Sequence, residues 1–446
     1  MKIIPVFAAA LLALSLPSLG RSAEGTPYAV PQVDAPALAA LGPHAIGTRR
    51  IAITSPDHAM LTPQGLVRGP RTIWARVWYP SAAQSGATAV SYTHTLPKIG
   101  GSGVVFSIPG LAVENAAVVA AGRLPLVIVS HGYSGWDSFT TWLTENLATK
   151  GYVVVAIDHD DAPFASAAGF FQSFNNVLIN RAQDQRDVIG YFATLAAKRD
   201  DALGKVIDAD RVGIIGYSMG GYGALATSGA DYDLDSPPLQ RLPAEARAAI
   251  LASQTKGTGI AARIKALVTI APWGGQPTTR VWTAASLAKL AKPVLVIDGS
   301  ADDVADYKQG VSWIYGQLTG SDRRLLVFQN ALHNVGGNPA PAATKSDFSS
   351  HEYFADPVWR TERINAVNQH FITAFLDLSL KGDAAKAAYL NVPVASGNEA
   401  VWPTAFGENV GARTASDKET GYWRGFQRRT TLGLEMHHDA VAALRR

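Results

Sequence analysis

The sequence predicts an α/β fold with a mostly parallel, doubly wound sheet. Two continuous apolar runs, Leu124–Ser130 and Gly151–Asp158, are typical of strands that are covered on both faces. Helix-compatible segments at Ser138–Lys150 and Arg181–Lys198 alternate with these runs, and the alternation indicates parallel pairing with right-handed crossovers. Further apolar runs extend the sheet to about six parallel strands. They are Arg211–Ile215, Ala266–Ile270, Val294–Ile297 and Leu325–Phe328.

The segments around this repeat have other patterns. Arg49–Ser55 and Thr72–Tyr79 alternate in polarity and are expected to form antiparallel edge strands. The stretch 81–122 contains Pro, Gly and Ser residues and has little periodicity. From Asp356 to Leu380 apolar residues recur at the spacing of one buried helix face, which predicts a helix that closes the fold.

One domain is expected after an N-terminal leader. Lys2, an apolar run and a small-residue exit near Ala23 have the three parts of a secretory signal, so residues 1–23 are expected to be a signal peptide of a periplasmic or secreted protein. The domain would then cover 24–446. Its core is expected at about 47–383, and a C-terminal extension packed on the body at about 384–446.

Composition excludes several function classes. The 446 residues are 47% hydrophobic and can bury a large core. The formal charge of +3 comes without a long single-sign block, so neither a nucleic-acid partner nor stable membrane insertion is expected. The chain has no cysteine, which excludes disulfides and thiolate chemistry. A small-molecule partner is favoured, and the sequence does not determine the oligomeric state.

A nucleophile is predicted at Ser218. Gly216-Tyr217-Ser218-Met219-Gly220 joins a β-branched run to a helix-compatible segment, and such a strand–turn–helix leaves the central hydroxyl exposed at a sharp apex. The flanking glycines let strand and helix approach each other closely. An ordinary glycine-rich turn is the alternative interpretation of the same pattern.

An acid and a base follow the serine in the order that this chemistry needs. A serine hydroxyl requires a base to take its proton, and the base requires a carboxylate to fix its tautomer. Asp302 follows a buried strand and is the predicted acid, with its neighbour Asp303 as the alternative. His333 follows the last strand and is the predicted base, with His351 as the competitor.

Two backbone N–H groups are predicted to stabilise the oxyanion. They belong to Met219, directly after the nucleophile, and to Tyr133 in the His131-Gly132-Tyr133 loop after an earlier strand. Tyr133 and Trp273 are also candidate substrate-binding residues, since both follow strand ends on the same sheet edge. A tryptophan buried in the core is the alternative for Trp273.

Three other segments have simpler interpretations. Asp158, His159, Asp160 and Asp161 could hold a cation, but helix capping or solvation is favoured. The polar stretch from Asp231 to Gly259 is either a lid or, by default, a surface insertion. His437 and His438 are expected to be solvated. No metal and no organic cofactor is needed for the predicted chemistry.

These motifs resemble those of the α/β-hydrolase superfamily. The resemblance covers about Arg49 to Asp383. Within the superfamily, the sequence is similar to a secreted bacterial branch near platelet-activating-factor acetylhydrolases, dienelactone hydrolases and cutinase-like polyester hydrolases. It implies the α/β-hydrolase fold with a catalytic triad of Ser218, Asp302 and His333. Three features depart from these relatives: a serine where dienelactone hydrolases have cysteine, a chain longer than cutinases and without their disulfide, and an unmatched tail.

The resemblance implies a serine carboxylesterase that acts through an acyl-serine intermediate on a small-molecule, lipid-like or polymeric ester. A lipase, phospholipid deacylase or polyester hydrolase of the same mechanism is the alternative, and an amidase or peptidase is chemically allowed. A catalytically silent member that only binds a ligand is the hypothesis from another class.

Overall fold

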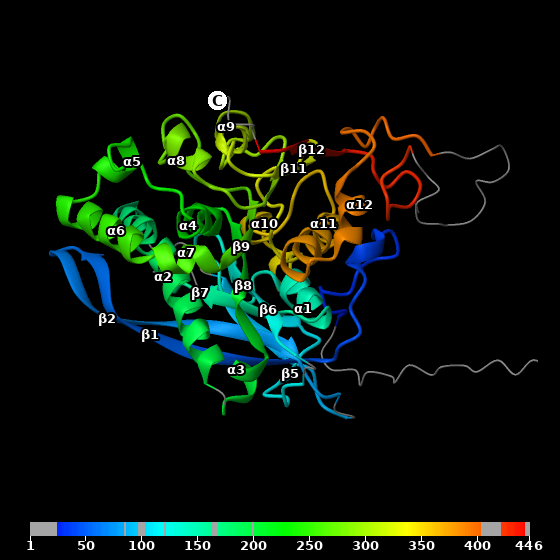
Figure 1. Cartoon of the computed structure of the whole chain (residues 1–446), viewed down its shortest axis with the longest axis horizontal. Helices are drawn as coiled ribbons and strands as arrows, with labels where there is room; N and C mark the ends of the chain where they lie inside the picture. Colours follow the sequence, from blue (N-terminus) through cyan, green and yellow to red (C-terminus); the bar gives the residue numbers. More distant parts are fainter. Residues whose placement is uncertain are drawn as a thin grey trace, which may run out of the picture.

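The computed structural model describes residues 25–83, 86–96, 103–119, 122–161, 167–198, 200–402 and 421–441. The predicted signal peptide lies outside these residues. Most described strands form one ten-stranded sheet in the order β12-β11-β10-β9-β8-β6-β7-β2-β1-β5 (Figure 1). Within the described residues, no helix combines the length and the apolar character that a membrane crossing requires.

The predicted α/β architecture is confirmed. The central strands pair in parallel in the order β7-β6-β8-β9-β10-β11, so consecutive strands are joined by crossovers through helices. Their bounds are β6 Leu124–Ser130, β7 Val153–Asp158, β8 Ile207–Tyr217, β9 Ile264–Ile270, β10 Val294–Gly299 and β11 Arg323–Phe328. Their side chains are buried on both faces, as their continuous apolar sequences require.

The antiparallel edge is longer than the sequence indicates. β1 Ile46–Thr62 and β2 Gly65–Pro80 form a long hairpin, and β2 pairs antiparallel with β7. The short β5 Val113–Glu114 adds to β1. In the stretch 81–122, whose sequence has little periodicity, β3 Ser91–Leu96 and β4 Val104–Pro109 form a separate two-stranded sheet.

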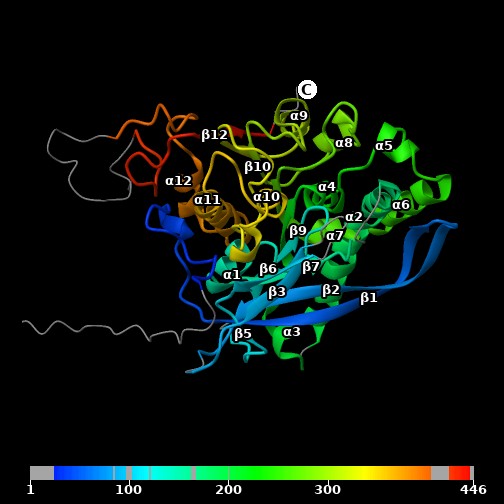
Figure 2. The same ribbon diagram turned by 180° about the vertical axis from the view of Figure 1, so that it is seen from behind.

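Helices cover both faces of the large sheet (Figure 2). One core layer packs α2, α4 and α6 against it, and the other packs α1 and α11. The α-helices are α1 Thr141–Thr149, α2 Ala167–Ala197, α3 Ala202–Val206, α4 Met219–Thr227, α5 Pro237–Gln240, α6 Ala244–Lys256, α7 Thr258–Arg263, α8 Ala284–Ala288, α9 Ser312–Gln317, α10 Phe348–Glu352, α11 Thr361–Lys381 and α12 Ala387–Leu390. Shorter helical turns are η1 Ala37–Ala39, η2 Tyr307–Val311, η3 Ala342–Thr344 and η4 Ala384–Lys386.

The segment considered as a lid contains α5 and α6. α6 packs against α2, and its buried residues Ala246, Ala249 and Ile250 belong to the core layer that covers one face of the sheet. This packing favours the surface-insertion interpretation over a mobile lid.

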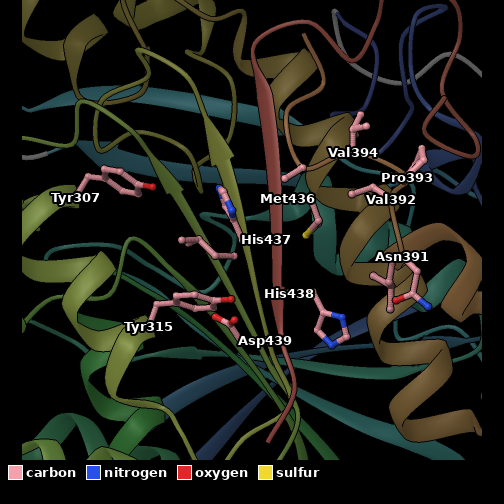
Figure 3. Close-up of a pocket in the computed structure, with 13 residues that line it drawn as sticks. Tyr307, Tyr315, Asn391, Val392, Pro393, Val394, Met436, His437, His438 and Asp439 are labelled. Atoms are coloured by element: carbon pink, nitrogen blue, oxygen red, sulfur yellow. The ribbon is translucent and has the colours of Figure 1, made fainter. Parts of the chain in front are cut away.

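The C-terminal extension completes the other edge of the sheet. β12 Leu434–Asp439 pairs antiparallel with β11, an element that was not anticipated from the sequence. Trp423 and Phe426 are buried, and both rings contact Phe371 of α11. A hollow of about 590 Å³ runs around β12, with Tyr307 and Tyr315 on one side of the strand and Asn391 on the other (Figure 3).

A buried histidine makes the stability of this fold depend on pH. His370 of α11 is fully buried, and its Nδ1 accepts a hydrogen bond from the backbone N–H of Leu38 at 3.1 Å. Burial, reinforced by the charge of Lys150, lowers the pKa of His370 from 6.5 to about 3. The folded state therefore holds a neutral ring, and its contribution to stability is complete above pH 6.5 and is lost as pH falls toward 3.

Replacing His370 with asparagine is expected to flatten this acid dependence. The amide oxygen can still accept the Leu38 N–H but cannot take up a proton. Between pH 6 and 4, the free energy of unfolding of His370→Asn should fall less steeply than that of the wild type, by about 1 kcal/mol per pH unit. Urea unfolding at several pH values measures both slopes, and equal slopes would contradict the assignment.

Candidate active site

Ser218 occupies the sharp turn between β8 and α4. Its φ of 52° and ψ of −114° are strained for a residue with a side chain. A Cβ added at Gly216 would lie 2.2 Å from the carbonyl oxygen of Gly220, and one added at Gly220 would lie 2.0 Å from the carbonyl oxygen of Ser130. Both flanking positions therefore require glycine, and the turn presents the serine hydroxyl at the carboxyl edge of the sheet.

The structure brings Ser218, His333 and Asp302 into one hydrogen-bonded chain. The Oγ of Ser218 lies 3.0 Å from Nε2 of His333, and Nδ1 of the same ring lies 2.7 Å from Oδ2 of Asp302. With the proton on Nδ1 donated to the carboxylate, Nε2 is the acceptor that faces the serine hydroxyl. The side chains of His333 and Asp302 are 12% and 0% exposed, so solvent reaches the base but not the acid.

Asp302 is held as a fixed carboxylate. Its Oδ1 accepts the backbone N–H groups of Val304 and Ala305, both at 2.8 Å. Burial alone would raise the pKa of Asp302, but the hydrogen bond and charge of His333 outweigh burial and leave that pKa below its usual value. An ionised group at this place can hold the imidazole and stabilise its cation.

A second buried carboxyl stands behind Asp302. Asp298 is fully buried near the end of β10, and burial together with the charge of Asp302 raises its pKa well above the usual value. This shift favours the neutral form of Asp298, so that Asp302 carries the negative charge that faces His333.

The hydrogen-bond contacts with His333 and Ser218 come from the predicted residues and not from the two competitors, Asp303 and His351. Asp303 is exposed, whereas its neighbour Asp302 points inward to the histidine. His351 lies in α10, and His333, not His351, contacts the Oγ of Ser218. The ring of Tyr217 packs against His333 with centroids 5.3 Å apart, which limits rotation of the imidazole.

The candidate oxyanion donors flank the nucleophile. Met219 is the first residue of α4, so its N–H is one of the groups that an α-helix leaves without an intrahelical acceptor. The His131–Gly135 loop follows β6, and a Cβ added at Gly132 would lie 3.2 Å from the Cβ of Ser218. The backbone that carries the Tyr133 N–H therefore passes directly beside the serine.

His131 has a structural part in this loop. Its Nδ1 contacts the carbonyl oxygen of Gly132 at 2.6 Å, and its Nε2 accepts the backbone N–H of His159 at 3.2 Å. Burial, with the charge of Arg181, lowers the pKa of His131 to about 3. The ring is neutral at physiological pH, and both of its nitrogens are engaged with backbone.

The interpretation of residues 158–161 as capping or solvated groups is wrong for His159 and Asp161. Nδ1 of His159 lies 2.9 Å from the fully buried carboxylate of Asp184. Asp161 accepts a hydrogen bond from Arg181 at 2.7 Å, and both side chains are almost completely buried. The partners, Arg181 and Asp184, lie on α2. The sequence of residues 158–161 alone gives no sign that this helix packs against the end of β7.

Aromatic side chains form one wall near the triad. Trp273 is only 8% exposed, and Phe174 of α2 packs edge-on against it with centroids 5.3 Å apart. Tyr133 contacts Phe174 and Phe170 at 5.6 Å each. Trp273 is therefore largely a core residue, and the wall next to the predicted substrate site continues through Tyr133 and the first turns of α2. The sequence reading missed Phe170 and Phe174 because their helix lies far from the site in sequence.

Comparison with known proteins agrees with this geometry. A family model described as PET hydrolase-like matches residues 115–236, which include the nucleophile turn. The chain is 26% identical over 211 residues to cutinase est1 of Thermobifida alba, covering 46% of this chain and 52% of that protein. It is 23% identical over 325 residues to bis(hydroxyethyl) terephthalate hydrolase of Streptomyces coelicolor, covering 71% of this chain and 86% of that protein.

A third relative, lipase 1 of a Moraxella species, is 31% identical over 107 residues, or 23% of this chain and 27% of that protein. The match to cutinase est1 spans about half of that protein's length. The nucleophile turn, the strand order and these similarities agree on one conclusion. The chain has the α/β-hydrolase fold and is similar to ester and polyester hydrolases of that superfamily.

Proposed function

We propose that this protein is a secreted or periplasmic serine esterase that cleaves carboxylic esters through an acyl-serine intermediate. The observation that supports this most is the continuous hydrogen-bonded chain from Ser218 through His333 to Asp302. An alcohol, an imidazole and a carboxylate in this order are what acyl transfer requires. The sequence signal at residues 1–23 supports export.

The reaction follows from this geometry. Nε2 of His333 takes the hydroxyl proton of Ser218 as Oγ attacks the ester carbonyl, and Asp302 stabilises the resulting imidazolium. The N–H groups of Tyr133 and Met219 would hold the negative oxygen of the tetrahedral intermediate. The imidazolium then protonates the departing alcohol. In the second half, His333 takes a proton from the water whose oxygen attacks the acyl carbonyl. It then gives that proton to Oγ of Ser218, which leaves as the free serine hydroxyl while the carboxylic acid is released.

The aromatic wall supports an ester with a flat or short acyl group over a long aliphatic chain. Rings favour edge-to-face and offset contacts with another ring, and Tyr133 and Phe174 can offer such contacts beside the nucleophile, with Trp273 packed behind Phe174. The name of the Streptomyces relative contains an aromatic diester, bis(hydroxyethyl) terephthalate, and esters of this kind are the proposed substrate class here.

A panel of methyl esters tests the proposal. Methyl benzoate, methyl butyrate and methyl palmitate, with bis(hydroxyethyl) terephthalate as the diester, should separate the candidates by kcat/KM. We expect the aromatic and butyric esters to exceed the palmitate by about tenfold or more. A preference for palmitate would instead favour a lipase.

Phe174→Ala adds an internal control to this panel. Loss of one ring contact is expected to lower kcat/KM for the aromatic esters by up to about tenfold, with methyl butyrate little changed. An equal loss for both substrates would contradict an aromatic contact at this wall.

A further inference from the structure

The loop that carries the Tyr133 N–H is fixed at its next residue. Ser134 has a φ of 58°, a left-handed conformation that is uncommon for a residue with a side chain. Its backbone N–H donates to Oδ2 of Asp161 at 2.9 Å, and its carbonyl oxygen accepts the hydroxyl of Tyr353 at 3.1 Å. Both backbone polar groups of this strained residue are therefore hydrogen-bonded, and the partner of its N–H is a carboxylate.

That carboxylate is itself held by a buried cation. Arg181 donates to the same Oδ2 of Asp161 at 2.7 Å, and the two side chains are 0% and 4% exposed. Burial alone would raise the pKa of Asp161, but the charge of Arg181 outweighs burial and keeps that pKa below its usual value. The acceptor for Ser134 is therefore a full negative charge, which makes the hydrogen bond stronger than a neutral one.

Arg181 also connects this loop to the nucleophile helix. It lies on α2, and a Cβ added at Gly223 of α4 would come within 2.6 Å of its Cγ. Ser218 immediately precedes α4. The ion pair thus spans the distance between the two segments that would supply the oxyanion donors.

We propose that Asp161 and Arg181 are positioning residues of the oxyanion hole. Their ion pair holds the strained Ser134, and Ser134 in turn fixes the adjacent Tyr133 peptide relative to Ser218. Neither side chain touches the substrate. This proposal rests on the proposed esterase function, because it assigns to the pair an effect on the transition state and not on substrate binding.

Three variants test the pair. Asp161→Ala removes the acceptor of the Ser134 N–H, and Asp161→Asn keeps an oxygen there without the charge. Asp377→Asn is the matched control, because this carboxylate of α11 also pairs with a cation, Lys381 at 2.8 Å, and accepts the hydroxyl of Tyr152 at 2.7 Å, but belongs to the opposite core layer.

The expected effect is on kcat. Asp161→Ala should lower kcat by about 10- to 100-fold, less than the loss of a whole oxyanion donor, with KM changed by less than about threefold. Asp161→Asn should recover most of this loss and remain about three- to tenfold below the wild type, and Asp377→Asn should keep the wild-type kcat. A boronic acid, which forms a tetrahedral adduct with the serine, should bind Asp161→Ala more weakly by about the factor lost in kcat.

Several outcomes would overturn the proposal. They are a kcat of either Asp161 variant within twofold of the wild type, a loss that appears in KM alone, or an equal loss in Asp377→Asn. Thermal unfolding of every variant separates a general loss of stability from this effect, and Asp161→Asn decides if Asp161→Ala does not fold. If Ser218→Ala retained esterase activity, the proposed function itself would fail, whereas an inactive Ser218→Ala beside a fully active Asp161→Ala would exclude only the positioning role.

Discussion

Replacing Ser218 with alanine is expected to abolish ester hydrolysis. The variant removes the Oγ that lies 3.0 Å from Nε2 of His333, and no cysteine is present to take over the attack. Loss of the nucleophile in a triad typically lowers kcat by about 10⁵-fold or more. KM should change little, because the oxyanion donors and the aromatic wall remain in place.

The measurement is kcat/KM with methyl butyrate, together with labelling by a fluorophosphonate. The wild type should be modified at Ser218 and the variant should not. Ser228→Ala is the matched control, since Ser228 is also a buried serine and lies at the other end of α4. Undiminished turnover in Ser218→Ala would place the nucleophile elsewhere, and absence of a covalent adduct in the wild type would favour a binding protein without catalysis.

The parallel sheet could be predicted because its strands are buried on both faces. Such strands have continuous apolar sequences, and each site residue follows one of them directly, as Asp302 follows β10 and His333 follows β11. Carboxyl ends of parallel strands meet at one edge, so the order of the motifs was enough to bring distant residues together.

Other elements could not be predicted because their stability depends on distant partners. β12 reads Leu-Glu-Met-His-His-Asp and resembles a polar tail until β11 pairs with it. β3 is anchored by Tyr92, whose hydroxyl donates to the buried Glu145 of α1 at 2.7 Å. Sequence periodicity reports only on neighbouring residues, so it cannot predict contacts with distant partners.

The buried ion pair between Asp161 and Arg181 could not be predicted from the sequence for the same reason, because its two residues meet only in the folded chain. Asp161 looks like a loop carboxylate in sequence, and only the fold brings the guanidinium of Arg181 against it. The aromatic wall also requires the tertiary structure, since Phe174 reaches Trp273 from another part of the chain. The sequence thus predicts the hydrogen-bonded side chains Ser218, His333 and Asp302 better than the groups that hold them in place.

The proposed role of Asp302 as the acid of the triad is tested by Asp302→Asn, for which a loss in kcat of about 10³- to 10⁴-fold is expected. An asparagine amide donates toward Nδ1 of His333, where the carboxylate accepted, so the ring proton moves to Nε2. The imidazole then has no lone pair directed at the hydroxyl of Ser218 and cannot act as the base. KM should remain near the wild-type value, because Asp302 is fully buried behind the histidine.

Asp303→Asn provides the control for this assignment. The two residues are adjacent and undergo the same chemical change, but Asp303 is exposed and only Asp302 contacts His333. Asp303→Asn should therefore keep kcat within about twofold, as substitutions at exposed sites usually do. The opposite result, an inactive Asp303→Asn beside an active Asp302→Asn, would move the acid by one residue. Similar losses in both variants would indicate that the loop after β10, and not one carboxylate, supports the histidine.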